Sequence, residues 1–113
     1  MASMKLETHE GTFADPAQIE HIAPAVEGLT EVGKAYIILD NGDETYVQAA
    51  GTVGEHFIVE RRDSCAGEHY RCDQRVTAAD LVIILSRYLH GSPDWSHGLT
   101  WHRVKVDGDA PSA

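Results

Sequence analysis

The chain has 113 residues, which is enough for one domain with a single core and too few for two. Its composition, 42% hydrophobic and 24% charged, is that of a folded globular protein and excludes an intrinsically disordered chain. Asp and Glu number 18 against 9 Lys and Arg, giving a net charge of −9. This balance argues against nucleic acid and anionic membrane as partners, because both attract basic surfaces.

The sequence leads us to expect neither a membrane span nor a signal peptide. No apolar run approaches the roughly 20 residues that span a bilayer, and no basic segment followed by an apolar one marks a signal peptide. We therefore expect a cytoplasmic protein. We also expect one domain over residues 1–113, with residues 1–10 and 107–113 flexible, because the last segment is polar and has nothing to bury.

The first predicted element is a short helix that begins near Asp15. Asp15 is a favourable N-terminal capping residue, Pro16 suits the first helical position, and Gln18 stands where a capping box requires it. Apolar residues then recur at helical spacing. Pro24 is expected to kink or end this helix, because it has no amide hydrogen to donate.

The clearest strands cover residues 34–39 and 44–50 and flank Asn41-Gly42. Asn-Gly is the strongest short hairpin signal, since both central residues of a type I′ turn have positive φ. A two-residue turn here directs one set of side chains to the core: Tyr36, Ile38, Val47 and Ala49. The opposite face is partly apolar, so it is expected to be covered by another element or presented to a partner, including a second copy of the chain in a homodimer.

Residues 55–62 and 68–72 continue the meander, and residues 99–106 predict a final strand. The most strongly indicated helix covers about residues 78–89. Thr77 and Asp80 resemble a capping box, an apolar stripe follows, and Gly91 and Pro93 end the helix. The predicted fold class is therefore α+β: an antiparallel sheet of four to five strands, packed against a C-terminal amphipathic helix and a short N-terminal helix.

One segment carries side chains that bind metals in other proteins. Cys65, His69 and Cys72 lie within eight residues, but structural zinc sites usually need four ligands. On a strand, His69 and Cys72 also point to opposite faces. We predict no metal site and no cofactor, since the chain also lacks the glycine-rich motifs that bind nucleotide phosphates. A reducing cytoplasm argues against a disulfide between Cys65 and Cys72.

Catalytic signals are also weak. Cys65 is a candidate nucleophile if His69 or His56 serves as its base, but a loop thiol without activity explains it as well. The serine elbow G-x-S-x-G does not occur. Trp95 and Trp101 follow the second helix, and we expect them to anchor the loop and last strand onto it. The alternative is that Trp95 is an exposed anchor for a partner. We predict no catalytic residue.

The order of several short segments indicates a family resemblance. A strand ending Ile-Leu-Asp is followed by Thr-Tyr-Val-Gln-Ala-Ala-Gly, Phe-Ile-Val-Glu-Arg-Arg, His-Tyr-Arg, a helix, Tyr88-Leu-x-Gly-x-x-x-Trp95 and Trp101. This pattern, over about residues 34–103, resembles small bacterial α+β proteins of the polymorphic-toxin immunity type. The resemblance implies a protein that neutralises a toxin by binding it, with no catalytic residues.

Two functions follow as hypotheses. The first is a non-enzymatic protein-binding domain, an immunity-like inhibitor that masks a basic effector protein. Its candidate contacts are acidic, polar or aromatic: Asp40, Asp43, Glu44, Tyr46, Gln48, Glu60 and Trp95. The second is a small-ligand-binding or catalytic domain that uses a concave sheet face lined by Tyr46, Gln48, His56, Glu60 and His69.

Overall fold

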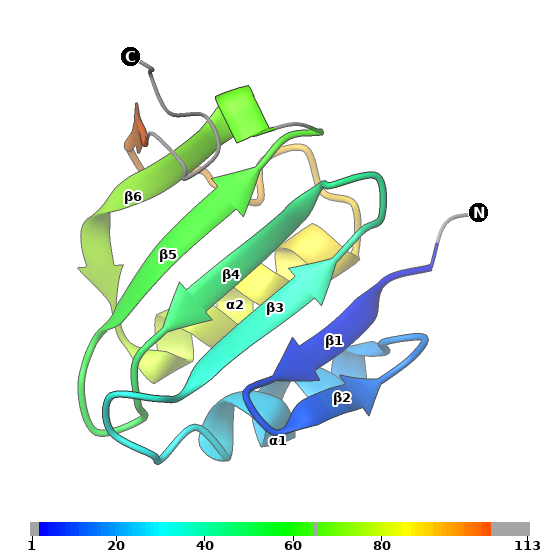
Figure 1. Ribbon diagram of the computed structural model, residues 1–113, viewed down its shortest axis with the longest axis vertical. Coiled ribbons are helices and arrows are strands. Elements are labelled where there is room, and N and C mark those ends of the chain that lie inside the picture. The colour runs from blue at the N-terminus through cyan, green and yellow to red at the C-terminus, as the bar shows by residue number, and fades with distance from the viewer. Residues whose placement is uncertain (1–2, 65, 105–113) are drawn as a thin grey trace.

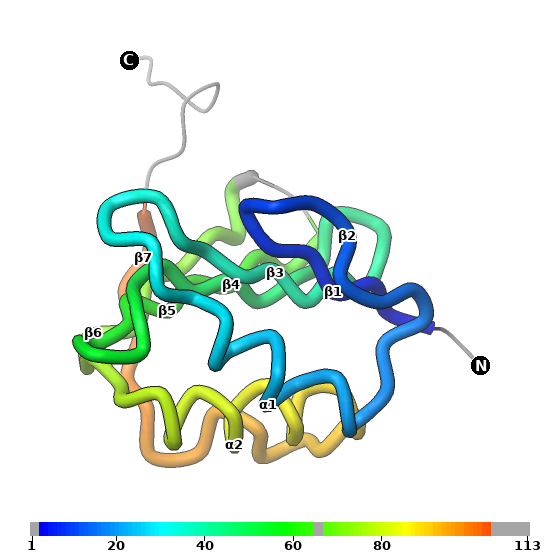
Figure 2. Tube along the Cα trace, turned by 90° about the horizontal axis from the view of Figure 1, so that it is seen from below, coloured from blue at the N-terminus to red at the C-terminus, as the bar shows by residue number. Residues whose placement is uncertain are grey.

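A computed structural model describes residues 3–64 and 66–104 and shows an α+β fold in two layers. Seven antiparallel strands form one sheet in the order β2-β1-β3-β4-β5-β6-β7. Figure 1 looks onto the sheet with both α-helices behind it, and Figure 2 shows the two layers from the side. The elements in chain order are β1 (Lys5–Thr8), β2 (Gly11–Ala14), α1 (Ile19–Glu27), β3 (Tyr36–Asp40), β4 (Tyr46–Ala50), β5 (Phe57–Arg62), a 3-10 turn (Ala66–Glu68), β6 (His69–Val76), α2 (Ala78–Leu89) and β7 (Trp101–Arg103).

The α+β class with an antiparallel sheet is confirmed, but the predicted count of four to five strands is wrong. The meander accounts only for β3 to β6, and the first hairpin, β1–β2, was not predicted. Residues 1–10, which we expected to be flexible, contribute β1, which pairs with both β2 and β3 and fully buries Leu6. A strand of four residues is too short for its alternation to stand out in sequence. Residues 107–113 lie outside the described residues.

The β3–β4 hairpin forms at the predicted place with a longer turn. Asp40 pairs with Tyr46, so five residues connect the strands instead of two. Gly42, Asp43 and Glu44 all have positive φ, and the Asp40 carboxylate accepts the Gly42 amide at 2.8 Å. Because the pairing shifts by an odd number of residues, β3 presents its other face to the core. Ile37 and Leu39 are buried there, and Tyr36 and Ile38 point away.

The two helices begin and end for different reasons. Helix α1 begins at Ile19, later than predicted, and the His21 side chain accepts the Gln18 amide at 2.9 Å. It continues past Pro24, which is exposed, so that water can solvate the carbonyl left without an amide partner. Helix α2 covers the predicted residues, and its first turn is capped by the Thr77 hydroxyl, which accepts the Asp80 amide.

The carboxyl end of α2 is a Schellman motif. Gly91 has a φ of 76°, and its amide donates to the Tyr88 carbonyl. The Ser92 amide donates to the Arg87 carbonyl, which completes the motif. The chain then loops beneath the helix layer and returns to the sheet as β7 (Figure 2). Neither described α-helix is long and apolar enough to cross a membrane.

The core lies between the helices and one face of the sheet. Alternate residues of the central strands are buried there, and α2 contributes Leu81, Ile84 and Leu85. Phe57 and Val59 face this core, on the side of β5 opposite to Ile58 and Glu60. In the described part of the chain, both α-helices lie on this side, which leaves the opposite sheet face without a covering helix (Figure 2). We call that uncovered surface the open face.

Candidate functional site

Strand register arranges the open face in three rows that run across β3, β4, β5 and β6. The loop-end row, beside the β3–β4 connection, contains Asp40, Tyr46, Arg62 and His69. The middle row contains Ile38, Gln48, Glu60 and Arg71. The groove-end row contains Tyr36, Ala50, Ile58 and Arg75. Neighbouring members of a row are directly paired, so their side chains are close enough to interact.

Glu60 is the centre of the polar contacts on this face. Its Oε1 lies 2.6 Å from Nε2 of His69 and 3.2 Å from Nε2 of Gln48, and its Oε2 accepts the Arg71 Nε at 2.9 Å. An ionised carboxylate only accepts hydrogen bonds, so His69 must donate from Nε2. Three donors from β4 and β6 therefore hold one carboxylate of β5 in place.

Burial and hydrogen bonding oppose each other at Glu60. Burial acts to raise the pKa of the carboxyl, but the hydrogen bonds from His69 and Arg71 outweigh it, and the pKa is lowered overall. Glu60 is therefore ionised at neutral pH. His69 is only 5% exposed and lies edge-on to the Tyr46 ring, with centroids 6.2 Å apart. Its Nδ1 is buried without a hydrogen-bond partner among the described residues.

A groove runs along the groove-end row of the open face and reaches the middle row. It has two adjoining lobes of about 430 and 420 Å³, which share Tyr36, Ala50 and Ile58 as an apolar floor. Gln48, Glu60 and Arg71 line the far end of the first lobe, and Lys34, His56 and Arg75 line the second. Tyr36 is 42% exposed and Ile58 37% exposed, unusually high values for large side chains in the middle of a sheet.

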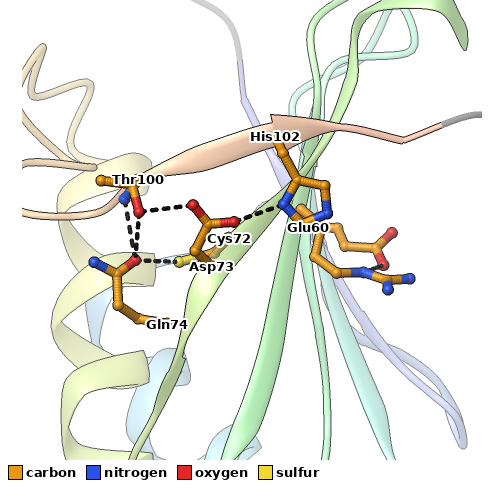
Figure 3. Close-up of polar contacts among 7 residues, drawn as sticks. Glu60, Cys72, Asp73, Gln74, Thr100 and His102 are labelled. Carbon is orange, nitrogen blue, oxygen red and sulfur yellow. Dashed lines mark hydrogen bonds and ion pairs between the residues drawn. The ribbon is translucent and has the colours of Figure 1, made fainter.

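A second polar network joins β6 to the segment that leads into β7 (Figure 3). The Thr100 hydroxyl donates to Asp73 at 2.9 Å, and the His102 Nδ1 lies 2.6 Å from the same carboxylate. Gln74 Oε1 accepts the Thr100 amide at 3.0 Å and the Cys72 thiol at 3.3 Å. The contact with His102 holds the pKa of Asp73 below its usual range. Together these contacts anchor a three-residue edge strand.

The environment of Cys72 disfavours a role as a nucleophile. Its side chain belongs to the core, and burial raises the pKa of its thiol, which disfavours the reactive thiolate. His69 is on the open face, so the two side chains point to opposite sides of β6, as their spacing predicted. Cys65 lies outside the described residues. Among residues 3–64 and 66–104, no group of three His, Cys, Asp or Glu is arranged to hold a metal ion.

The structure brings together six of the seven predicted partner contacts. Asp40, Tyr46, Gln48 and Glu60 belong to the loop-end and middle rows, and Asp43 and Glu44 lie in the connection beside them. Trp95 lies apart from these six, between Tyr88 and Trp101. Its ring centroid is 4.9 Å from that of Tyr88 and 5.8 Å from that of Trp101. It anchors the loop after α2, which agrees with the structural interpretation rather than with an exposed partner contact.

Sequence reasoning missed the groove-end row. The predicted two-residue turn places Tyr36 and Ile38 in the core. The predicted fourth strand stops at Cys72, so that Arg75 falls outside the predicted sheet. The signal that would have found Arg75 is the alternation of Arg71, Asp73 and Arg75, which continues the strand to Val76. His56, predicted to share a face with Glu60, lines the second lobe of the groove on that same open face.

Comparison with known protein families, curated proteins and solved structures finds no match for this chain.

Proposed function

We propose that this protein is a non-enzymatic protein-binding domain, an immunity-like inhibitor that masks a basic effector protein. The observation that supports this most strongly is the gathering of six acidic, polar and aromatic side chains at one end of an uncovered sheet face. We call this surface the loop-end surface: Asp40, Asp43, Glu44, Tyr46, Gln48 and Glu60. The same function is the one expected from the sequence pattern of residues 34–103.

Charge at the loop-end surface favours a basic partner. Asp40 and Asp43 form no ion pair within the described residues, and Asp43 is exposed at the tip of the connection. Glu44 contacts Arg62 at 3.2 Å, but its side chain remains 64% exposed. Together with the net charge of −9, these carboxylates would accelerate encounter with a basic protein and orient it.

The surface is also ordered before any partner arrives. Glu60 is held by three donors, and the Arg62 guanidinium lies over the Tyr46 ring at 5.5 Å. Side chains that are already fixed lose less conformational entropy on binding. Tyr46 is half-buried between charged neighbours, an arrangement common among residues that dominate interface energies.

The experiment uses the purified chain as bait in lysate of its native host at low salt, with cross-linking and mass spectrometry to identify the captured protein. The captured protein is then purified and titrated by calorimetry against wild type, the double variant Asp40→Asn/Asp43→Asn and Tyr46→Ala. The control, Glu20→Gln/Glu27→Gln, removes the same charge from the exposed side of α1. We expect a basic protein whose affinity falls about 10-fold or more in Tyr46→Ala, falls in the Asp double variant, and is unchanged in the control.

Three results would contradict the proposal. One is that no protein is recovered at low salt. Another is that the identified partner binds the control and the Asp40→Asn/Asp43→Asn variant equally well. The third is that only a second copy of this chain is recovered, which would make the loop-end surface a homodimer interface.

A further inference from the structure

The groove at the other end of the open face has a charge opposite to that of the molecule. The second lobe is lined by Lys34, His56 and Arg75, and no Asp or Glu is among its lining residues. This is unexpected in a chain with twice as many acidic as basic residues. The carboxylate that reaches the first lobe, Glu60, is already bound by His69 and Arg71.

Lys34 and Arg75, the Lys and Arg side chains of the second lobe, are also unusual in forming no ion pair within the described part of the chain. Across residues 3–64 and 66–104, ion pairs engage Lys5, Arg61, Arg62, Arg71 and Arg103. Lys34, Arg75 and Arg87 form none, and two of these three line the same lobe. Both are exposed, so neither is held in place by burial.

The floor between these cations and the middle row is apolar. Tyr36, Ala50 and Ile58 are directly paired across β3, β4 and β5, and Arg75 is the next member of their row. Ile58 is therefore directly paired with an arginine that forms no ion pair within the described residues, and the exposed Tyr36 ring lies farther along the same row and lines the same lobe. Each lobe has a volume at the lower end of the range for small-molecule sites, about 300–1,000 Å³.

We infer that this groove binds a small carboxylic acid with an aromatic or aliphatic body. The body would cover Tyr36 and Ile58, and the carboxylate would pair with Arg75 and Lys34. A planar carboxylate matches the two parallel N–H donors that an arginine offers. A polar phosphorylated ligand would satisfy the cations but would leave the apolar floor exposed, so it fits less well.

This site does not depend on the proposed protein-binding function. The loop-end surface and the second lobe of the groove lie at opposite ends of the same strands, about 13 Å apart along the five residues of β3. Asp40 and Asp43 line neither lobe. Substitutions of Asp40 and Asp43 therefore leave the contacts of both lobes intact, and the two functions can fail separately.

The test is a titration of the isotopically labelled chain, followed by backbone amide chemical shifts. The probes are 3-phenylpropanoate, 3-phenylpropan-1-ol and 3-phenylpropan-1-amine, which share one body and carry a negative, neutral or positive head. The variant is Lys34→Gln/Arg75→Gln. The control is Arg87→Gln, which removes the third unpaired cation from α2, and all these side chains are exposed, so the fold should be kept.

We expect millimolar binding of the acid, as for other ligands this small, with shifts confined to residues 33–36, 50–51, 56–58 and 75. The acid should bind more tightly than the alcohol by about 2- to 5-fold per cation, and the amine should bind most weakly. Lys34→Gln/Arg75→Gln should abolish the preference for the acid, and Arg87→Gln should retain it. Equal binding of acid and alcohol, shifts elsewhere, or the same loss in Arg87→Gln would overturn the inference.

Discussion

His69 Nε2 lies 2.6 Å from Glu60 Oε1, and the two side chains are only 6% and 16% exposed. This pair ties β6 to β5 on the open face, away from the hydrophobic core. Gln48 and Arg71 donate to the same carboxylate from both neighbouring strands. The open face is thus crossed by a polar contact that does not depend on the helices, and its removal should weaken the sheet locally.

Glu60→Gln is the direct test of that contact. The Gln side chain replaces one carboxylate oxygen, which accepts a hydrogen bond, with an amide nitrogen, which can only donate one. It also lacks the negative charge that strengthens all three hydrogen bonds. We expect the free energy of unfolding to fall by about 1.5–3 kcal/mol, measured by urea denaturation. Glu7→Gln is the control, since within the described residues Glu7 forms an ion pair only with the partly exposed Lys5, and its substitution should cost under about 1 kcal/mol. An equal loss of unfolding free energy in the two variants would show that the contacts of Glu60 stabilise the fold no more than an exposed surface ion pair does.

The lowered pKa of Glu60 also predicts a pH dependence. Its pKa in the folded protein lies below the unfolded value of about 4.3, so the unfolded state binds more protons as the pH falls through that window. The stabilisation is complete above about pH 4.3 and is lost as the pH falls through the folded pKa. Unfolding curves at a series of pH values should therefore show the gap between wild type and Glu60→Gln closing in acid. A gap that stays constant at every pH would contradict the assignment.

Gly51 is required by the close approach of two backbone segments. Its φ is 148°, and a Cβ on it would lie 2.6 Å from the carbonyl oxygen of His56. Gly51→Ala should therefore destabilise the protein by more than about 1 kcal/mol. Gly54→Ala is the matched control in the same connection, because no heavy atom of the described residues lies within 4 Å of a Cβ at that position. Thermal unfolding should separate the two variants clearly, and similar melting temperatures would argue against the strain.

Tyr88 gives a prediction at alkaline pH. Burial, together with the charges of Asp63 and Asp40, raises the pKa of its phenol to about 12, and its hydroxyl has no hydrogen-bond partner among the described residues. The unfolded state loses this proton near pH 10, so stability should fall between about pH 10 and the folded pKa. Tyr88→Phe should leave stability at neutral pH unchanged or slightly higher, and it should flatten the alkaline decline. A marked loss of stability at neutral pH would instead reveal a hydrogen bond from the hydroxyl.

The parts of the fold that were predictable from sequence are those in which local signals agree. Thr77, the apolar stripe and Gly91 all mark α2, and α2 has the predicted bounds. The Asn41-Gly42 turn was located correctly, but its length depends on three consecutive residues of positive φ. Two of them, Asp43 and Glu44, are not glycine, and positive φ is uncommon in non-glycine residues. The resulting register places Tyr36 and Ile38 on the open face, whereas a two-residue turn predicts both of them in the core. The loop-end surface was predictable because Tyr46 and Gln48 alternate with the buried Val47 and Ala49 of β4. The groove was not predictable, because the two-residue turn places Tyr36 and Ile38 in the core and because the predicted fourth strand stops before Arg75.

The position of β1 has a consequence for the order in which the chain folds. The first strand of the sequence lies inside the sheet, and Leu6 pairs with Leu39 across the whole of β2 and α1. By contrast, each strand from β3 to β6 pairs with the next strand in sequence. The formation of this part of the sheet therefore requires the closure of short loops only. During synthesis, the β1–β2 hairpin must wait for β3 before it can dock. We expect the central meander to form first and the docking of this hairpin to limit the folding rate.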